Sequence, residues 1–289
     1  MAALRHGDFD LNGYVIGGDD SRPVYAVGLD TGVADHRGQD EENPSGDDRF
    51  FGRDLLSGPT WTFEFRMGSA TPEASLAALA GITRCWRSAP RDTGAESVLR
   101  YSVGGRTRRV YGRPRRFSQN PNLVFIMGHI AAAGQFVTKD SLHYGDELQS
   151  LTVTLVPGDA GGLVSPLISP LTTVAGGTRQ GIIPDVGGDA PAPLTATFRG
   201  PVTNPSVSSR GWVIGLNTSL AYDQSVTVDT RNGTVLRNDG ASLGGALTRR
   251  TYLPEARLQP GAQEIIYTGT DPTGTSSCTV AWRPAFYGF

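Results

Sequence analysis

Residues 224–240, QSVTVDTRNGTVLRNDG, contain the pattern that decides the fold class of this chain. Apolar and polar residues alternate up to Val228 and again from Val235, and Asn232-Gly233 lies between the two runs. A period of two is typical of a half-buried strand, and Asn-Gly accepts the positive φ angles that a two-residue hairpin turn requires. The stretch therefore predicts a β-hairpin, and similar patterns elsewhere predict a mainly β protein.

The composition agrees with short strands joined by turns. Of the 289 residues, 38 are Gly and 19 are Pro, and 19% are charged, which is less than soluble domains usually carry. A net charge of −2 argues against bulk attraction to nucleic acid or membranes. No signal peptide is recognisable, and the longest apolar stretch, 123–136, is too short to span a bilayer. Cys85 and Cys278 are far apart in the sequence, so we expect free thiols in a protein made in a cytoplasm.

The first half of the chain predicts three further elements. In residues 59–67, PTWTFEFRM, aromatic and polar residues alternate, which indicates a strand. Residues 71–86 predict a helix, because Thr71 can cap it and Pro72 suits its first position. Residues 98–111 predict a hairpin with a Gly-Gly turn. The apolar stripe expected on the helix consists of Leu76, Leu79, Ile82 and Trp86.

Changes in composition and periodicity along the sequence predict two domains. Another alternating strand, SLTVTLVP, ends at Pro157-Gly158, after which residues 159–193 are rich in Gly, Pro, Ala and Thr without a sustained period. Regular alternation returns at residue 194 and continues to the end with the turn spacing of a β-sandwich. We expect domains at 1–158 and 194–289, joined by a linker at 159–193.

No constellation in the sequence predicts catalysis. There is no G-x-S-x-G elbow, P-loop or dinucleotide fingerprint, and neither cysteine lies in a catalytic signature. The acidic stretch 30–48 lacks the spacing of an EF-hand, so an exposed polar loop is the simpler interpretation. We predict no enzyme activity, no cofactor and no metal site.

Basic residues cluster between Ser97 and Thr138, where there is no carboxylate. Arginines interleaved with aromatic residues suit nucleic acid in outline, but the whole chain has no basic excess, which favours a bidentate contact with another subunit or with the acidic stretch. Side chains alternate in facing along a strand, so we expect some of these arginines to be free for a partner. The candidate subunit-interface residues are Arg108, Arg109, Arg113, Arg115 and Arg116.

Trp212 and Trp282 lie in the predicted C-terminal sandwich. They are candidates for a sugar-stacking platform, although tryptophans in such strands are more often part of the core. A carbohydrate-binding virion module that contacts the host envelope is therefore one alternative function. A nucleic-acid-binding protein is a second, less favoured one.

The order of several segments resembles the distal tail proteins of long-tailed phages, which in phages of actinobacteria are called minor tail proteins. In the first half these segments are FFGRDLLSGPTWTFEF, the helix that ends near Trp86, RVYGRPRRFS and GQFVTKDSLHYGDE. In the second half they are APLTATFRGPVTNPSV, VTVDTRNGTVL and the closing LQPGAQEIIYTG and SSCTVAWRPAFYGF. The acidic stretch 30–48 is similar to an insertion relative to a minimal member of the family.

This resemblance implies an N-terminal β-sandwich-type domain with one helix and a C-terminal galectin-like β-sandwich. It implies a structural protein of the siphovirus tail that forms a homohexameric ring at the end of the tail tube. Expected partners are copies of the chain, the tail tube protein, the tape measure protein and tail-tip or receptor-binding proteins of the baseplate. The expected location is the virion tail, assembled in the host cytoplasm, with no membrane insertion and no specific nucleic acid.

Overall fold

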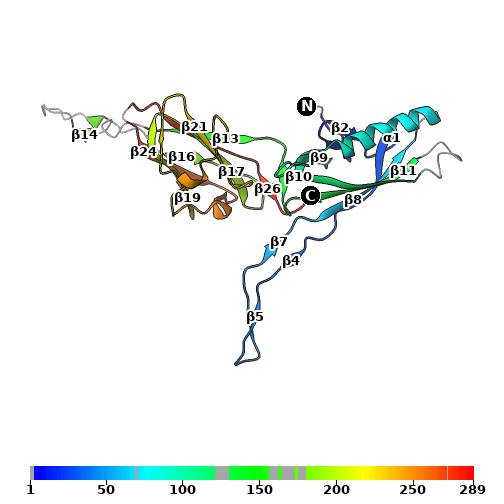
Figure 1. Cartoon of the computed structure of the whole chain (residues 1–289), viewed down its shortest axis with the longest axis horizontal. Coiled ribbons are helices and arrows are strands. Elements are labelled where there is room, and N and C mark those ends of the chain that lie inside the picture. Colours follow the sequence, from blue (N-terminus) through cyan, green and yellow to red (C-terminus); the bar gives the residue numbers. More distant parts are fainter. Residues whose placement is uncertain are drawn as a thin grey trace. The chain divides into compact units, whose positions relative to one another are not determined.

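The chain folds into a mainly β structure with one α-helix among the residues described (Figure 1). The computed structural model describes residues 3–68, 71–120, 130–155, 162–163, 173–174, 180–271 and 273–289. Within this part of the chain, no helix is long and apolar enough to cross a membrane. The internal contacts form two compact units, called here the first unit (Met1–Asp146 with Tyr287–Phe289) and the second unit (Glu147–Phe286).

The first unit is built on an antiparallel sheet whose strands follow the order β2-β1-β9-β10-β11-β8-β3. A further short strand, β12 (His143–Gly145), pairs with β10. The sheet strands are β1 (Phe9–Leu11), β2 (Tyr14–Ile16), β3 (Val24–Asp30), β8 (Thr60–Met67), β9 (Ser97–Val103), β10 (Arg106–Asn120) and β11 (Ile130–Thr138).

Strand β8 confirms the alternation read from PTWTFEFRM. Trp61, Phe63, Phe65 and Met67 are all buried, whereas Glu64 on the other face is exposed. Phe65 packs edge-on against Trp86 with ring centroids 5.5 Å apart, so the aromatic face of β8 is covered by the helix. This contact joins the two strongest sequence patterns of the first half into one core.

Helix α1 (Pro72–Arg87) begins as predicted, with Thr71 Oγ1 accepting the Ala74 N–H at 3.3 Å. The predicted apolar stripe is wrong at one position, because Leu76 is 49% exposed and Ser75 is buried instead. Positions 75, 79, 82 and 86 follow the helical period more closely than a stripe that begins at 76. Ser75 therefore lies where the sheet leaves room for a small side chain.

The predicted Gly-Gly hairpin is confirmed. Gly104 and Gly105, which join β9 to β10, have φ angles of +59° and +76°. Positive φ at both central residues is the requirement of a type I′ turn, which only glycine and a few polar residues meet without strain.

The second unit is a β-sandwich of two antiparallel sheets, with the strand orders β13-β25-β17-β21-β22 and β16-β24-β18-β19. Phe198 of the first sheet and Tyr267 of the second are buried together, with ring centroids 6.1 Å apart. The strands are β13 (Gln149–Thr154), β16 (Gln180–Ile183), β17 (Ala192–Arg199), β18 (Val202–Ser209), β19 (Trp212–Gly215), β21 (Ser225–Asp229), β22 (Thr234–Arg237), β24 (Gln263–Thr270) and β25 (Ser277–Trp282).

Shorter elements complete the second unit. They are β14 (Gly162–Leu163), β15 (Thr173–Val174), β20 (Ser219–Leu220), β23 (Arg257–Leu258), β26 (Ala285–Phe286) and the 3₁₀ turns η2 (Gly244–Ala246) and η3 (Leu253–Glu255). Trp212 and Trp282 are 8% and 5% exposed, so both belong to the core and form no stacking platform.

The hairpin predicted from residues 224–240 is present as β21 and β22, but its turn differs from the prediction. Asp229 pairs with Thr234, which leaves a four-residue loop, and only Gly233 in this loop has a positive φ, of +66°. The Asp229 carboxylate accepts the N–H groups of Arg231 at 2.9 Å and Asn232 at 3.1 Å. An aspartate-stabilised turn thus replaces the two-residue turn expected from Asn-Gly.

The boundary between the two units differs from the expected one at residue 158. Strand β13 precedes that position but pairs along its whole length with β25 of the second unit. Within the stretch expected to be a linker, β16 pairs with β24, and Val186 and Ala190 are completely buried. Residues 159–161, 164–172 and 175–179 of that stretch lie outside the described part of the chain.

Candidate interface surfaces and the buried arginine network

A row of charged side chains crosses three neighbouring strands of the first unit. Asp10 of β1 is the register partner of Arg100 in β9, and Arg100 is the partner of Arg109 in β10. Register partners share one face of a sheet, so local alternation and strand pairing together place these groups side by side. Each of the three residues is only 8% exposed.

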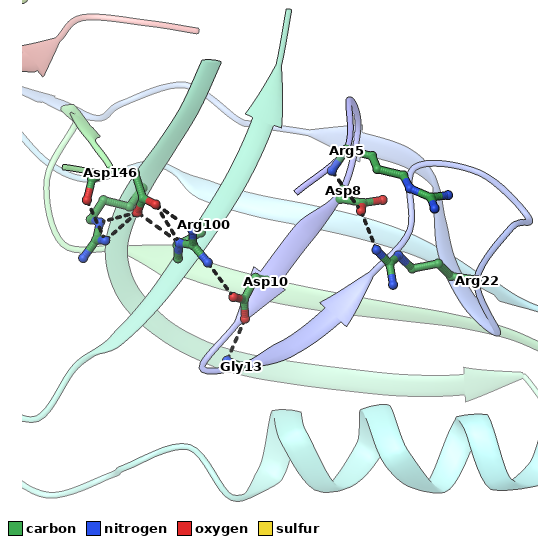
Figure 2. A network of polar contacts seen from close by, with 8 residues as sticks. Arg5, Asp8, Asp10, Gly13, Arg22, Arg100 and Asp146 are labelled. Atoms are coloured by element: carbon green, nitrogen blue, oxygen red, sulfur yellow. Dashed lines mark hydrogen bonds and ion pairs between the residues drawn. The ribbon is translucent and has the colours of Figure 1, made fainter. Parts of the chain in front are cut away.

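Asp146 joins the two arginines of this row (Figure 2). Arg100 donates from Nη2 to its carboxylate at 2.6 Å, and Arg109 donates from Nε at 3.1 Å. Arg100 also donates from Nη1 to Asp10 at 2.9 Å, and Asp10 accepts the Gly13 N–H at 2.6 Å. Two carboxylates and two guanidinium groups thus neutralise one another inside the fold.

The protonation equilibria follow from these contacts. Burial by itself would raise the pKa of the Asp146 carboxyl, but the hydrogen bonds and positive charges of Arg100 and Arg109 lower it below its ordinary value. The hydrogen bond to Asp146 raises the pKa of Arg100. Both side chains are therefore charged at neutral pH, and removing one partner would leave a buried charge without compensation.

A second ionic contact fastens the beginning of the chain. Arg22 donates to Asp8 at 2.9 Å, and the same carboxylate accepts the Arg5 N–H at 3.2 Å (Figure 2). Asp8 is 2% exposed, and its other oxygen accepts the Gly18 N–H at 3.3 Å. This carboxylate links the segments before and after the β1–β2 hairpin.

Arg108 lies in a different cluster of the first unit, together with aromatic side chains. It donates a short hydrogen bond to the Gly288 carbonyl, while the Phe289 ring stacks on Trp61 with centroids 5.6 Å apart. The Tyr101 hydroxyl shares a short hydrogen bond with Nδ1 of His143. Burial and, to a smaller extent, the positive charge of Arg108 lower the pKa of His143 to about 4, so the imidazole is neutral at pH 7.

The five candidate interface arginines thus occupy three kinds of site. Arg108 and Arg109 are buried and bonded within the first unit. Arg113 donates to the carbonyl of Ala95 at 2.6 Å and to that of Arg91 at 3.4 Å. Arg115 and Arg116 are exposed, at a point where the register between β10 and β11 shifts.

The network includes residues that the sequence analysis did not single out. Asp10 and Asp146 lie in short polar interruptions of apolar segments, in DFDLNG and HYGDEL, which is the signal that could have marked them. Their connection to Arg100 and Arg109 depends on strand register and on a return of the chain after β12. Neither is visible in a local pattern.

The acidic stretch belongs to an extended ribbon between β3 and β8, called here the acidic ribbon and comprising residues 31–58 (Figure 1). It consists of the two-stranded pairs β4 (His36–Arg37) with β7 (Leu55–Leu56) and β5 (Glu41–Glu42) with β6 (Arg49–Phe50). Its three arginines are outnumbered by its seven carboxylates, Asp35, Asp40, Glu41, Glu42, Asp47, Asp48 and Asp54.

The acidic ribbon has no core of its own. All its residues are described, and none of residues 32–56 is buried. Val33 is 89% exposed and Phe51 is 85% exposed, and the Asp40–Arg49 ion pair spans 3.9 Å at the surface. A two-stranded ribbon is marginally stable in water by itself, and exposed apolar groups on such an element mark an interaction surface.

The described residues contain neither a candidate metal site nor a reactive cysteine. No group of three His, Cys, Asp or Glu side chains there could hold a metal ion. Cys85 and Cys278 are free, and burial raises the pKa of the Cys85 thiol to about 11, which makes it a poor nucleophile at neutral pH. His129 lies outside the described residues.

Comparisons with known proteins find similar folds among solved structures but no match to a family or to a curated sequence. No known protein family matches the chain, and no curated protein matches its sequence. The Dit protein of phage SPP1, described as a paradigm of the hub adsorption apparatus in phages that infect Gram-positive bacteria, has 13% sequence identity and a TM-score of 0.59. The alignment covers 96% of this chain and 98% of that one.

Two structures of the phage P2 baseplate in its activated conformation, one with Ca and one with Sr, also match. Each has 10% identity and a TM-score of 0.51, and covers 95% of this chain and 97% of the matching chain. These similarities extend over nearly the whole length of every chain compared. The chain therefore has the mainly β, sandwich-containing fold of phage Dit and baseplate proteins.

Proposed function

We propose that this chain is a structural distal tail protein, which forms a ring at the end of a siphovirus tail tube and anchors the proteins of the tail tip. The observation that supports the proposal best is the fold similarity to the SPP1 Dit protein over 96% of this chain and 98% of the other. A match to one domain would suit many functions, because sandwich folds are widely reused. A match to both units in the same order is far more restrictive.

The proposal includes the partners and the place of action. The first unit makes a homohexameric ring that contacts the tail tube and tape measure proteins, and the second unit holds tail-tip or receptor-binding proteins for host attachment and DNA delivery. The protein acts in the virion tail after assembly in the cytoplasm of a host, for which we propose an actinobacterium. Such a component needs no catalytic activity.

Ring formation requires two different complementary patches on each subunit, because a closed ring uses heterologous interfaces. The acidic ribbon has an excess of four negative charges, from seven carboxylates and three arginines, and it exposes Phe50 and Phe51. Arg115 and Arg116 are exposed on β10. We assign the acidic ribbon of one subunit to the surface around Arg115 and Arg116 of the next.

The oligomeric state tests the ring directly. Light scattering and negative-stain images of the purified chain should show a hexamer, at high concentration or in the presence of the neighbouring tail proteins. A chain that remains monomeric at every concentration, with those proteins present, rejects the proposal.

Charge reversal tests the assigned patches. Arg115→Glu with Arg116→Glu should weaken the hexamer at least tenfold. Removal of one partner from a charge pair that loses solvent on association lowers the binding free energy by about 2 kcal/mol or more. Introducing Asp47→Arg and Asp48→Arg in the same chain should restore part of the association. Arg199→Glu, an exposed arginine of β17 in the second unit, is the matched control and should leave assembly unchanged. An intact hexamer in the double arginine variant would place the interface elsewhere while leaving the ring proposal standing.

A further inference from the structure

Two adjoining hollows lie on the β18–β19 side of the second unit. Their volumes are about 590 Å³ and about 560 Å³, and both are lined by Ser206, Val213 and Arg250. Arg249 lines the first hollow as well. Volumes of this size suit a small molecule or a short stretch of a polymer.

The two arginines occupy the centre of a tight turn. The Thr251 N–H donates to the Thr248 carbonyl at 3.0 Å, which makes Arg249 and Arg250 the two middle residues of a β-turn. Both side chains are exposed, and neither has a hydrogen bond or an ion pair among the residues that the structure describes. Their guanidinium groups are available to a ligand.

The turn is fixed to the end of β19. Gly215 donates its N–H to Thr251 Oγ1 at 2.9 Å and accepts the Thr248 N–H at 2.9 Å. A Cβ at Gly215 would come within 3.0 Å of Thr248 Oγ1, so glycine permits this close approach. The Asn217 N–H adds a bond to the Ala246 carbonyl at 2.7 Å. A turn held at both ends presents its two cations with little further loss of backbone entropy on binding.

The remaining lining groups differ between the two hollows: Pro205, Leu216 and Leu247 make much of the first one apolar, whereas the second one is mostly polar. The second hollow is lined by Ser206, Ser208, Ser209 and Thr268, in addition to Arg250. Neither hollow has a carboxylate among its lining residues. Trp212, which is 8% exposed, also lines the second hollow.

We propose that these two hollows form a binding site for an anionic polysaccharide, in which Arg249 and Arg250 pair with its negative groups. Ser206 and Thr268 hydrogen-bond each other at 2.6 Å and Ser209 donates to Gln263 at 3.2 Å, and their remaining hydrogen-bonding positions, together with the Ser208 hydroxyl, bind the sugar hydroxyls along the chain. Arg250 is the principal residue, because it lines both hollows. The negative group is a planar carboxylate or a phosphate, both of which guanidinium binds in a bidentate manner.

An acidic peptide would meet the arginines equally well but would gain less from the rest of the site. Protein partners usually anchor through large apolar or aromatic side chains in desolvated pockets. The hydroxyls that line the second hollow instead match a ligand that carries donors and acceptors along its whole length. The site does not depend on ring formation, since every residue in it belongs to the second unit of one chain.

Isothermal titration of the full-length chain with defined polymers tests the site. The probes are an oligogalacturonate, an oligomer of glycerol phosphate, neutral dextran and poly-glutamate. We expect binding to at least one of the first two, weakening with salt, and little or none to dextran or poly-glutamate. Binding to the oligogalacturonate alone identifies a uronate ligand, binding to the glycerol phosphate oligomer alone identifies a phosphate ligand, and binding to both supports the class.

Variants locate the interaction. Arg250→Gln should weaken binding at least tenfold and Arg249→Gln less, whereas Arg199→Gln removes the same charge from the other sheet and should change nothing. Ser208→Trp should block the second hollow without a change in charge. Thermal melting checks that each variant is folded. The proposal is overturned by the absence of binding to both anionic oligomers, by equally tight binding of poly-glutamate, or by an equal loss in Arg199→Gln.

Discussion

In the first unit a row of charged side chains crosses three strands, whereas the second unit pairs neutral hydroxyls across its strands. Asp10, Arg100 and Arg109 are buried. Arg100 pairs with both Asp10 and Asp146, and Arg109 pairs with Asp146. Among its described residues, the second unit has four pairs of hydroxyl side chains that hydrogen-bond across neighbouring strands. These pairs are Thr152–Thr279 at 2.9 Å, Thr197–Thr227 at 3.3 Å, Thr203–Ser219 at 2.9 Å and Ser206–Thr268 at 2.6 Å.

The two units also differ in how they stabilise a carboxylate that has lost most of its contact with solvent. Asp146 has two arginines as partners, whereas Asp271 in the second unit accepts the N–H groups of Thr273 and Ser276, each at 2.8 Å. Burial would raise the pKa of Asp271, but these hydrogen bonds lower it below its ordinary value. The charged network makes the first unit depend on a few residues, while the hydroxyl pairs distribute the polar contacts of the second unit over four separate positions.

The largest expected effect concerns the independence of the two units. A fragment of residues 147–286 should fold by itself, whereas a fragment of residues 194–289 should not, because it lacks β13 and β16 and leaves the edges of β25 and β24 with which they pair without hydrogen-bond partners. Circular dichroism and amide exchange of the two fragments measure this. A folded 194–289 fragment would show that β13 and β16 are dispensable and would return the boundary to the position expected from the sequence.

Removal of one carboxylate should reveal how far the first unit depends on its network. Asp146→Ala leaves two buried arginines without their shared partner, which should lower the free energy of unfolding by about 3 kcal/mol. Chemical denaturation of the full chain measures the loss. Asp239→Ala removes an exposed partner of Arg237 and should leave the denaturation midpoint unchanged. An equally small effect at both positions would mean that water compensates the charges of Arg100 and Arg109.

Acidification should affect the first unit alone between pH 7 and 5. All four histidines precede residue 147, and His143 has a pKa of about 4 in the folded state, below the ordinary value. The unfolded chain then binds more protons than the folded one, so stability falls as the pH falls, by about 1 to 2 kcal/mol over this range.

Amide exchange resolved along the chain would separate the two units in this experiment. His143→Asn retains an acceptor for the Tyr101 hydroxyl and cannot be protonated, so it should remove most of the pH dependence. The partners that face His143 are Arg108, Tyr101, Trp61 and Phe289, and of these only Arg108 is charged at neutral pH. A pH dependence that persists in His143→Asn would assign the effect to another group.

The smallest effect is expected at a hydroxyl pair. Thr197→Val keeps the shape of the side chain and removes one half-buried contact with Thr227, so the free energy of unfolding should change by about 0.5 kcal/mol or less. Denaturation of the same full-length chain gives a direct comparison with Asp146→Ala. A loss as large as that of the carboxylate variant would contradict the contrast drawn between the two units.

The sequence determined the local elements of this protein. The alternation of Trp61, Phe63, Phe65 and Met67 predicted β8, and Thr71-Pro72 predicted the start of α1. The Gly104-Gly105 turn was predicted as well. These signals work because the period of side-chain facing, helix capping and positive φ depend on residues close together in the chain.

Tertiary structure alone decided which elements belong together. The pairing of β13 with β25, the place of Tyr287–Phe289 in the first unit and the register of Asp10 with Arg100 join residues far apart in the sequence. Of the five arginines predicted at an interface, the fold buries Arg108 and Arg109 and leaves Arg115 and Arg116 exposed. A local pattern predicts that side chains alternate between the two faces of a strand, but it does not predict which arginines are buried. The exposure of Arg115 and Arg116 coincides with the register shift between β10 and β11, and Arg109 is bonded to a carboxylate that the fold brings to it.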